Sequence, residues 1–230
     1  NIKKLFQRAR ELEMPAVAIT DHGNMYGVKE FFKFANDKSN KDADGNFIVK
    51  PIVGCEAYCA RRGRHSMNRE QKMTNSEGRE YIIDRSGWHL ILLAKNKTGY
   101  LNLCKLASQA YVDGFYGKPR IDKNILEKYH EGLIVCSACL GGEIPQKIIA
   151  GDIKGAEEAV MWFKNIFGDD YYIELQRHKT DKPNASYDTF ERQEHVNPIL
   201  VDLARKCGVK IICTNDVHFV EENHGEAHER

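Results

Sequence analysis

The sequence predicts an α/β fold in which a mainly parallel β-sheet is closed or wound with helices on its outside. Short apolar runs rich in β-branched residues recur along the chain, and amphipathic stretches lie between them. Because strand-like and helix-like segments alternate, we expect each strand to lead through a helix to the next, which is typical of parallel sheets. The chain has 230 residues, enough for one large domain with a buried core.

Six apolar runs are the expected strands. Each is short and bounded by polar or turn-forming residues, as buried strands are. The runs cover residues 16–20, 52–57, 90–94, 133–137, 171–175 and 209–214. The stretches between them carry apolar residues at the i, i+3, i+4 spacing of amphipathic helices, with the opposite face polar. One of them holds Trp162, Phe163 and Phe167, which we interpret as core residues and not as a stacking platform.

Both ends of the chain and one internal segment depart from this alternation. The chain opens directly on a helical pattern without an initiator methionine, which suggests a fragment, and residues 221–230 read as the start of another helix. Residues 61–84 are polar and contain Gly63 and Gly78, so we expect a long loop or a projecting hairpin that is mobile outside the core. Basic residues outnumber acidic ones there. We interpret this excess, which includes Arg64, as a solvated loop, with a phosphate-backbone contact as the alternative.

The composition is that of a globular protein and limits the function classes. Hydrophobic residues make up 42% and charged residues 29%, and no run of about 18 apolar residues indicates a membrane span. Lys and Arg (34) nearly balance Asp and Glu (33), so any DNA contact must come from a local patch. The seven cysteines are odd in number and scattered, which favours reduced thiols in a cytoplasmic protein. Five are expected to pack as small apolar residues: Cys55, Cys59, Cys104, Cys207 and Cys213.

Polar residues with metal-binding chemistry follow several of the expected strands. His22 comes after the first run, Glu56 lies within the second, Cys139 follows the fourth, and Asp216 and His218 follow the sixth. In parallel α/β folds the carboxyl ends of the strands meet at one rim. Imidazole, carboxylate and thiolate groups from separate strands are suited to holding Zn²⁺, or a Mn²⁺/Zn²⁺ cluster, that activates water.

Each of these residues also has a purely structural interpretation. His22 alone fits a capping or turn residue. The D-x-H spacing puts Asp216 and His218 on the same face of an extended segment, but the two could equally point into water from a loop. Glu56 lies in an apolar stretch, where a carboxylate requires a cation partner or exposure at the strand end, and we favour the cation. His178, after the fifth run, could face the same rim, although a surface position is the simpler interpretation.

Cys136 and Cys139 form a C-x-x-C pair. No second pair lies at the distance expected of a zinc ribbon, so the motif does not indicate a structural zinc site. Alternation along the strand is expected to bury Cys136 and to leave Cys139 at the mouth of the rim.

Five strings in the sequence resemble one known family. They are AITDHGNMYG at residues 18–27, PIVGCE at 51–56, WHLILLAKN at 88–96, CLGGEI at 139–144 and TNDVHF at 214–219. In this order and spacing they resemble the PHP (polymerase and histidinol phosphatase) domain of the bacterial DNA polymerase III alpha subunit. The resemblance implies a PHP metal-binding domain over residues 1–220, with an excursion around 61–84, and the start of a connection to a polymerase domain over 221–230.

The resemblance implies a distorted seven-stranded (β/α) barrel with up to three divalent metal ions at the strand ends. The family's opening H-x-H strand has no counterpart after Asn1, so the first strand and its ligands are expected to be missing from this chain, and we expect fewer metals here. The implied ions are Zn²⁺, Mn²⁺ or Mg²⁺. The implied ligands are His22, Glu56, His89, Cys139, Asp216 and His218, and the implied catalytic residues are Asp216, His218 and His22. Strand direction alone gives a different prediction for His89. This residue stands at the start of an expected strand, whereas the other ligands stand at or after the ends of theirs, so His89 would lie at the opposite rim.

The implied function is part of a replicative DNA polymerase, a nucleotidyltransferase. Within it, the domain would carry a metal-dependent phosphoesterase or 3′–5′ exonuclease proofreading site, impaired in this chain, or the structural remnant of one. The alternatives are a free-standing PHP phosphoesterase such as histidinol phosphatase and a non-catalytic scaffold module. The implied partners are DNA, the polymerase core of the same full-length chain and other replisome subunits, with no membrane involved.

Overall fold

A computed structural model of the chain describes residues 1–66, 72–74, 80–82, 87–179, 188–221 and 224. Within these residues the main sheet has seven strands in the order β1-β2-β5-β7-β8-β9, and β6 pairs with β2. The strands are β1 (Ala16–Ile19), β2 (Lys50–Cys59), β5 (Trp88–Ala94), β6 (Arg120–Ile121), β7 (Leu133–Cys136), β8 (Tyr171–Leu175) and β9 (Lys210–Cys213). All six expected strands are present, and β6 is an additional short one.

The strands run parallel to their neighbours except at β5. The pairs β1–β2, β2–β6, β7–β8 and β8–β9 are parallel, whereas β5 is antiparallel to both β2 and β7. The prediction of a mainly parallel sheet is therefore confirmed, but it is wrong for β5. No described helix lies between β2 and β5, and strands joined without a crossover helix pair antiparallel.

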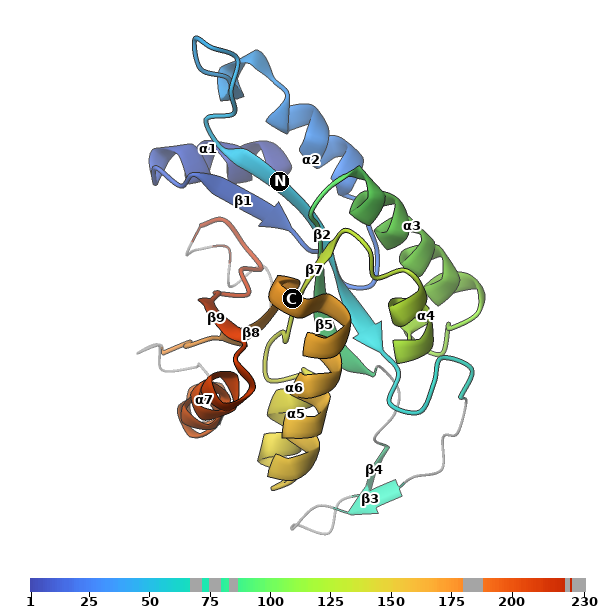
Figure 1. Cartoon of the computed structure of the whole chain (residues 1–230). Coiled ribbons are helices and arrows are strands. Elements are labelled where there is room, and N and C mark those ends of the chain that lie inside the picture. The colour runs from blue at the N-terminus through green and yellow to red at the C-terminus, as the bar shows by residue number, and fades with distance from the viewer. Residues whose placement is uncertain (67–71, 75–79, 83–86, 180–187, 222–223, 225–230) are drawn as a thin grey trace.

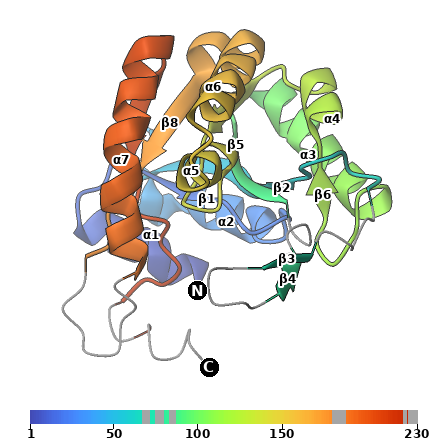
Figure 2. The same ribbon diagram turned by 90° about the horizontal axis from the view of Figure 1, so that it is seen from below.

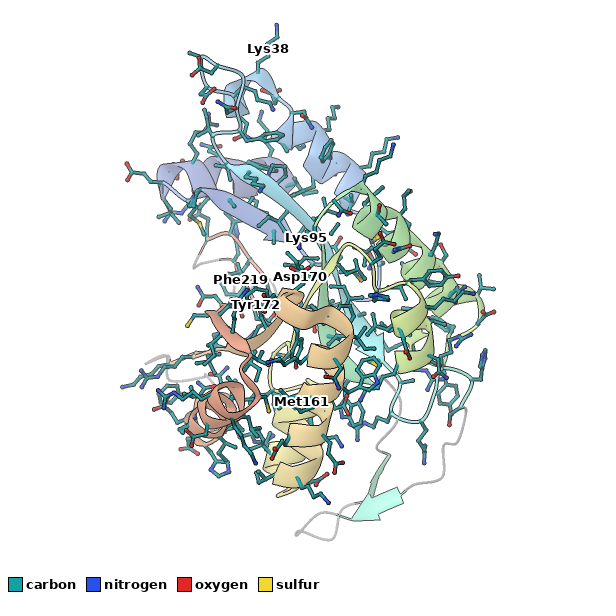
Figure 3. The ribbon with its side chains drawn as sticks, viewed as in Figure 1. Lys38, Lys95, Met161, Asp170, Tyr172 and Phe219 are labelled. Carbon is teal, nitrogen blue, oxygen red and sulfur yellow. The ribbon has the colours of Figure 1, made fainter. Side chains whose placement is uncertain are left out.

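A contact at one end of the sheet illustrates this reversal. Lys95, directly after β5, points its Nζ at the carboxylate of Asp170, directly before β8, at 2.7 and 2.9 Å (Figure 3). The carboxyl end of β5 thus lies beside the amino end of β8. The amino end of β5 consequently lies at the rim where β2, β7 and β8 finish.

The sheet curls into a half-barrel whose edges are β1 and β9, with the helices outside it (Figure 1). This agrees with the expected PHP-type barrel that lacks a strand. The helices are α1 (Ile2–Glu11), α2 (Val28–Ala35), α3 (Lys97–Val112), α4 (Lys123–Lys128), α5 (Glu143–Ile149), α6 (Ile153–Phe167) and α7 (Asp188–Cys207), with short 3₁₀ turns at Lys38–Asn40 and Gly168–Asp170. Figure 2 shows α5, α6 and α7 beside one another. Among the described helices, none combines the length and apolarity needed to cross a membrane.

Alternation along the strands separates a core face from a cavity face. Ala57, Leu92, Val135 and Ile173 point outward and pack with the helices in the main core. Their sequence neighbours point inward, because successive side chains of a strand leave opposite faces. The inward residues line a cavity: Glu56, Ile91, Leu93, Cys136 and Glu174. On α6, Phe163 and Phe167 are buried and Trp162 packs against them, which confirms their assignment to the core.

The excursion after β2 is anchored at its base. Arg64 Nη1 donates to both carboxylate oxygens of Asp122, at 3.2 and 3.1 Å, and the backbone N–H of Arg64 donates to the same carboxylate at 3.0 Å. Arg120, which is 1% exposed, donates to the carbonyl oxygens of Arg64 and Ser66. The interpretation of Arg64 as part of a solvated loop is therefore wrong, because a buried carboxylate faces it.

Further along the excursion, β3 (Lys72–Thr74) and β4 (Glu80–Ile82) pair antiparallel as a separate two-stranded sheet away from the main one, as in the hairpin alternative (Figure 1). The expected mobility of this segment falls largely on residues outside the described ones, as does most of the predicted helix at 221–230. Of the five cysteines expected to pack as apolar residues, Cys55, Cys59 and Cys207 are buried and Cys104 is partly buried, but Cys213 is exposed on the edge strand β9.

Candidate metal centre

Side chains from separate strands meet at one rim of the half-barrel. His22 follows β1 and bridges to Glu56 in β2, Cys139 follows β7, and His218 follows β9. His89 is the second residue of β5, and because β5 is antiparallel its first residues lie beside the ends of β2 and β7. The expectation from strand direction that His89 lies at the opposite rim is therefore wrong, since it assumed a parallel β5.

Three of these residues direct ligand-type atoms at one point. A carboxylate oxygen of Glu56, Nδ1 of His89 and Sγ of Cys139 all lie within 4.8 Å of one another. The distance from Cys139 Sγ to His89 Nδ1 is 3.4 Å, and Glu56 Oε1 contacts the same nitrogen. One ring N–H can satisfy only one of these two neighbours. Apart from its contact with His89 Nδ1, the buried Glu56 Oε1 has no hydrogen-bond partner among the described residues. This donor set fits a divalent cation, which would satisfy all three atoms together.

The local electrostatics favour positive charge at this point. Hydrogen bonding to Cys139 and to Glu56 raises the pKa of His89 to about 10, against the opposing effect of burial. Burial would raise the pKa of the Glu56 carboxyl, but the hydrogen bond and charge of His89 outweigh it, so that this pKa is lowered. His22 and His218 act in the same direction on Glu56. The pocket therefore stabilises a carboxylate and a cation side by side.

A second group of side chains adjoins the first through Glu56. His22 Nδ1 lies 3.3 Å from Glu56 Oε2, and His22 Nε2 lies 3.3 Å from Nε2 of His218. The other ring nitrogen of His218 lies 2.7 Å from the backbone oxygen of Asp216 and 3.9 Å from its carboxylate. Asp216 has φ 49°, a left-handed conformation that turns the chain at this position. Glu56 thus stands between two groups of possible ligands, one around His89 and Cys139 and one around His22 and His218.

A cavity of about 510 Å³ opens beside the second group. His22, Glu56, Asp216 and His218 form part of its wall, together with residues of the edge strands β1 and β9. His89 and Cys139 do not line it. The two groups therefore differ in that only the one around His22 and His218 lines this cavity.

Some polar residues near the predicted ligands have structural partners instead. Asp21 accepts a hydrogen bond from the backbone of Gly27, and the buried Glu143 pairs with Lys123 at 3.0 Å on the helix side. Cys136 is buried and Cys139 half-buried, as alternation predicts. His178, interpreted as a surface residue, is half-buried, and its Nε2 lies 2.8 Å from the backbone oxygen of Asn215.

The sequence reasoning missed Glu174. It is a buried carboxylate on the cavity face of β8. The signal that drew attention to Glu56, an ionisable residue inside an apolar run, is present in residues 171–175 as well.

Comparison with known proteins gives a consistent family assignment. The profile of the PHP domain family matches residues 1–178. DNA polymerase III subunit alpha of Thermus aquaticus is 42% identical over 217 residues, covering 94% of this chain and 15% of the relative. The subunit of Borreliella burgdorferi is 39% identical over 226 residues, covering 98% of this chain and 17% of the relative. That of Chlamydia pneumoniae is 35% identical over 243 residues, covering 100% of this chain and 18% of the relative.

The chain thus spans less than a fifth of the length of these relatives. The family profile covers most of the chain, and the half-barrel with ligand-type residues gathered at one rim agrees with it. The chain belongs to the PHP domain family and is homologous to the PHP domain of DNA polymerase III alpha subunits.

Proposed function

We propose that this chain serves as the PHP domain of a bacterial replicative DNA polymerase, and that its rim holds divalent cations used to hydrolyse phosphodiester bonds at DNA 3′ ends. The observation that carries the proposal is the meeting of Glu56, His89 and Cys139 at one point, beside His22 and His218. PHP domains generally bind divalent metals, and the polar donors of this chain are grouped as such binding requires. Replication would place the protein in the bacterial cytoplasm.

The proposed ligands are His22, Glu56, His89, Cys139, Asp216 and His218. Thiolate and imidazole donors favour Zn²⁺, and the carboxylates of Glu56 and Asp216 also suit Mn²⁺ or Mg²⁺. Bound there, a divalent cation would supply Lewis acidity toward a phosphoryl oxygen and toward water.

The group around His22 and His218 would have a different role from the group around His89 and Cys139. His22, Asp216 and His218 line the cavity, so the cations that they would hold would face the substrate and orient it. His89 and Cys139 do not line the cavity and would act only as ligands. This division supports His22, Asp216 and His218 as the catalytic residues.

The proposed partners follow from the relatives. Their name is that of a DNA polymerase subunit, and this chain spans 15–18% of their length. We infer that DNA, a polymerase core in the same full-length chain and other replisome subunits are the partners.

The test combines metal analysis with substrate choice. Elemental analysis of the chain after dialysis measures bound metal, with His22→Asn and Glu56→Gln as site variants and His195→Asn, an exposed histidine on α7, as the matched control. Hydrolysis is measured on the full-length protein that would contain this chain. The substrates are 3′-labelled single-stranded DNA and a small phosphomonoester. Metal-dependent shortening of DNA, lost in the site variants and kept in the control, is the expected result.

Two other outcomes would each overturn the proposal. Hydrolysis of the phosphomonoester but not of DNA would favour a free-standing phosphoesterase. Absence of both metal and hydrolysis would favour a scaffold module.

A further inference from the structure

Glu174 lies on the cavity face of β8 and is only 5% exposed. Both of its carboxylate oxygens already accept hydrogen bonds from protein donors. Oε2 accepts from the backbone N–H of Ala138 at 2.6 Å, and Oε1 accepts from the hydroxyl of Thr214 at 2.7 Å. Because each oxygen has its own protein donor, Glu174 is arranged to hold its neighbours.

The two donors belong to different ligand-bearing segments. Ala138 immediately precedes Cys139 in the loop after β7, and Thr214 begins the segment after β9 that carries Asp216 and His218. β8 lies between β7 and β9 in the sheet. A single buried carboxylate therefore connects the two segments from the strand between them.

The hydrogen bonds of Glu174 also stabilise an unfavourable backbone conformation at Ala138. Ala138 has φ 63°, in the left-handed region that a residue with a Cβ rarely adopts. Its N–H donates to Glu174, and the preceding Ser137 accepts, through its Oγ, the backbone N–H of Glu174 at 2.9 Å. The turn that presents Cys139 to His89 is thus held at the strained residue and at the residue before it.

Two further residues of the same face support the segment after β9. Gln176, two residues after Glu174, donates to Oγ1 of Thr214 at 3.2 Å. His178, two residues further, has its Nε2 2.8 Å from the backbone oxygen of Asn215. The period of two along an extended chain places Glu174, Gln176 and His178 on one side, facing this segment.

We propose that Glu174 is a positioning residue that sets the distance between Cys139 and the Asp216–His218 segment, without contacting metal. The inference rests on the proposed metal site. It predicts that Gln substitutes well at this position, because an amide can accept from Ala138 and donate to Thr214, whose hydroxyl keeps Gln176 as a partner. It predicts that Ala does not, because both donors then lose their acceptor.

The test compares Glu174→Gln and Glu174→Ala in the whole chain, with Glu143→Gln as a control for loss of a buried carboxylate elsewhere. The first measurement is hydrogen exchange of the Ala138 amide without metal. The second is Zn²⁺ affinity by competition with a chelating dye. The third is the thiolate-to-metal absorption band after Co²⁺ loading, which reports whether Cys139 is a ligand. We expect Glu174→Ala to accelerate exchange at Ala138, to weaken Zn²⁺ binding about 10–100-fold and to diminish the Co²⁺ band, while Glu174→Gln and Glu143→Gln stay close to the parent.

The outcomes separate this inference from the proposed function. If Gln weakens metal binding as much as Ala does, Glu174 acts through its charge as a ligand and the positioning role is wrong. If Ala leaves both the exchange and the affinity unchanged, the role is wrong as well. If the parent chain binds no metal, the proposed function fails, and Ala138 exchange still decides whether the carboxylate holds the turn.

Thr214→Val supplies the comparison if Glu174→Ala does not fold, because it removes one donor with little change in shape. This variant should weaken Zn²⁺ binding, and parent-like affinity would overturn the positioning role.

Discussion

Cys139 Sγ lies 3.4 Å from Nδ1 of His89, although fifty positions separate the two residues in the sequence. They meet because His89 lies near the start of β5, which runs antiparallel to β7, and the loop after β7 carries Cys139. Glu56 Oε1 approaches the same nitrogen from β2. A sulfur, a nitrogen and an oxygen atom, each from a different strand or strand end, are thereby placed to share one cation.

Replacing Cys139 by Ser should change which metal the chain prefers. Thiolate sulfur is a soft ligand that favours Zn²⁺, whereas a hydroxyl is a weak ligand for all these ions. We expect Cys139→Ser to lower Zn²⁺ affinity at least about 10-fold, with a smaller loss for Mn²⁺. Competition titrations with both metals measure the effect. Cys213→Ser, which alters an exposed thiol on β9, is the control and should leave both affinities unchanged.

Gly141→Ala should disturb the metal centre more than it disturbs the fold. A Cβ at Gly141 would lie 3.1 Å from Cγ and Nδ1 of the His89 ring, so the ring would have to move. We expect weaker Zn²⁺ binding with a loss of unfolding free energy below about 1 kcal/mol, because the rest of the loop is unaffected.

Gly151→Ala provides the opposite case. A Cβ there meets no atom within 4 Å, but φ is +76°. We expect it to lower the unfolding free energy by about 1–2 kcal/mol and to leave metal binding intact. Equal effects of the two substitutions on metal binding would contradict the placement of His89 against Gly141.

Removing His218 should lower the number of metal ions bound per chain, but the site formed by Glu56, His89 and Cys139 should keep its ion. Its Nε2 lies 3.3 Å from that of His22, outside the three-atom cluster of Glu56, His89 and Cys139. We therefore expect His218→Ala to keep a Zn²⁺ site and to lose any further ion, while His89→Ala loses the Zn²⁺ site itself. Isothermal titration and elemental analysis give the stoichiometry. An identical loss in both variants would show that the two groups bind as one unit.

The Asp122 carboxylate should stabilise the fold in a pH-dependent way. Burial would raise its pKa, but the amides of Arg64 and Ile125 and the guanidinium of Arg64 outweigh burial and lower the pKa. A lowered folded-state pKa means that the stabilisation is present above the unfolded value of about 3.9 and is lost as pH falls through the folded-state pKa.

Asp122→Asn tests this contribution, because Asn can retain the capping bond to Ile125 but loses both the charge facing Arg64 and the second oxygen, which accepts the Arg64 backbone N–H. We expect urea denaturation at pH 7 to show a loss of about 1–3 kcal/mol. The difference from the parent should shrink below about pH 4. Asp44→Asn, on an exposed turn, should change little at either pH. A difference that stays constant down to pH 3 would assign the effect to packing and not to charge.

The sequence alone determined the strands and the kinds of residue at the rim. Residues 171–175 and 209–214 alternate or run apolar as strands do, because hydrophobic period is a local property of the chain. The expected burial is wrong for β9, which is mostly exposed at the edge of the sheet. Asp216 and His218 were identified for a related reason. Ligand-type residues that directly follow a strand are brought to the rim by the strand itself.

Only the tertiary structure decided the direction of β5 and the partners of buried charges. His89 was expected at the wrong rim because strand direction depends on pairing between β2, β5 and β7, which no local pattern specifies. Arg64 and Glu174 gained their roles from Asp122 and from Ala138 and Thr214, at sequence separations of 36 to 58 residues. Hydrogen-bond partners at such separations are chosen by how the whole sheet curls, so the sequence shows a polar residue there but not which residue it holds.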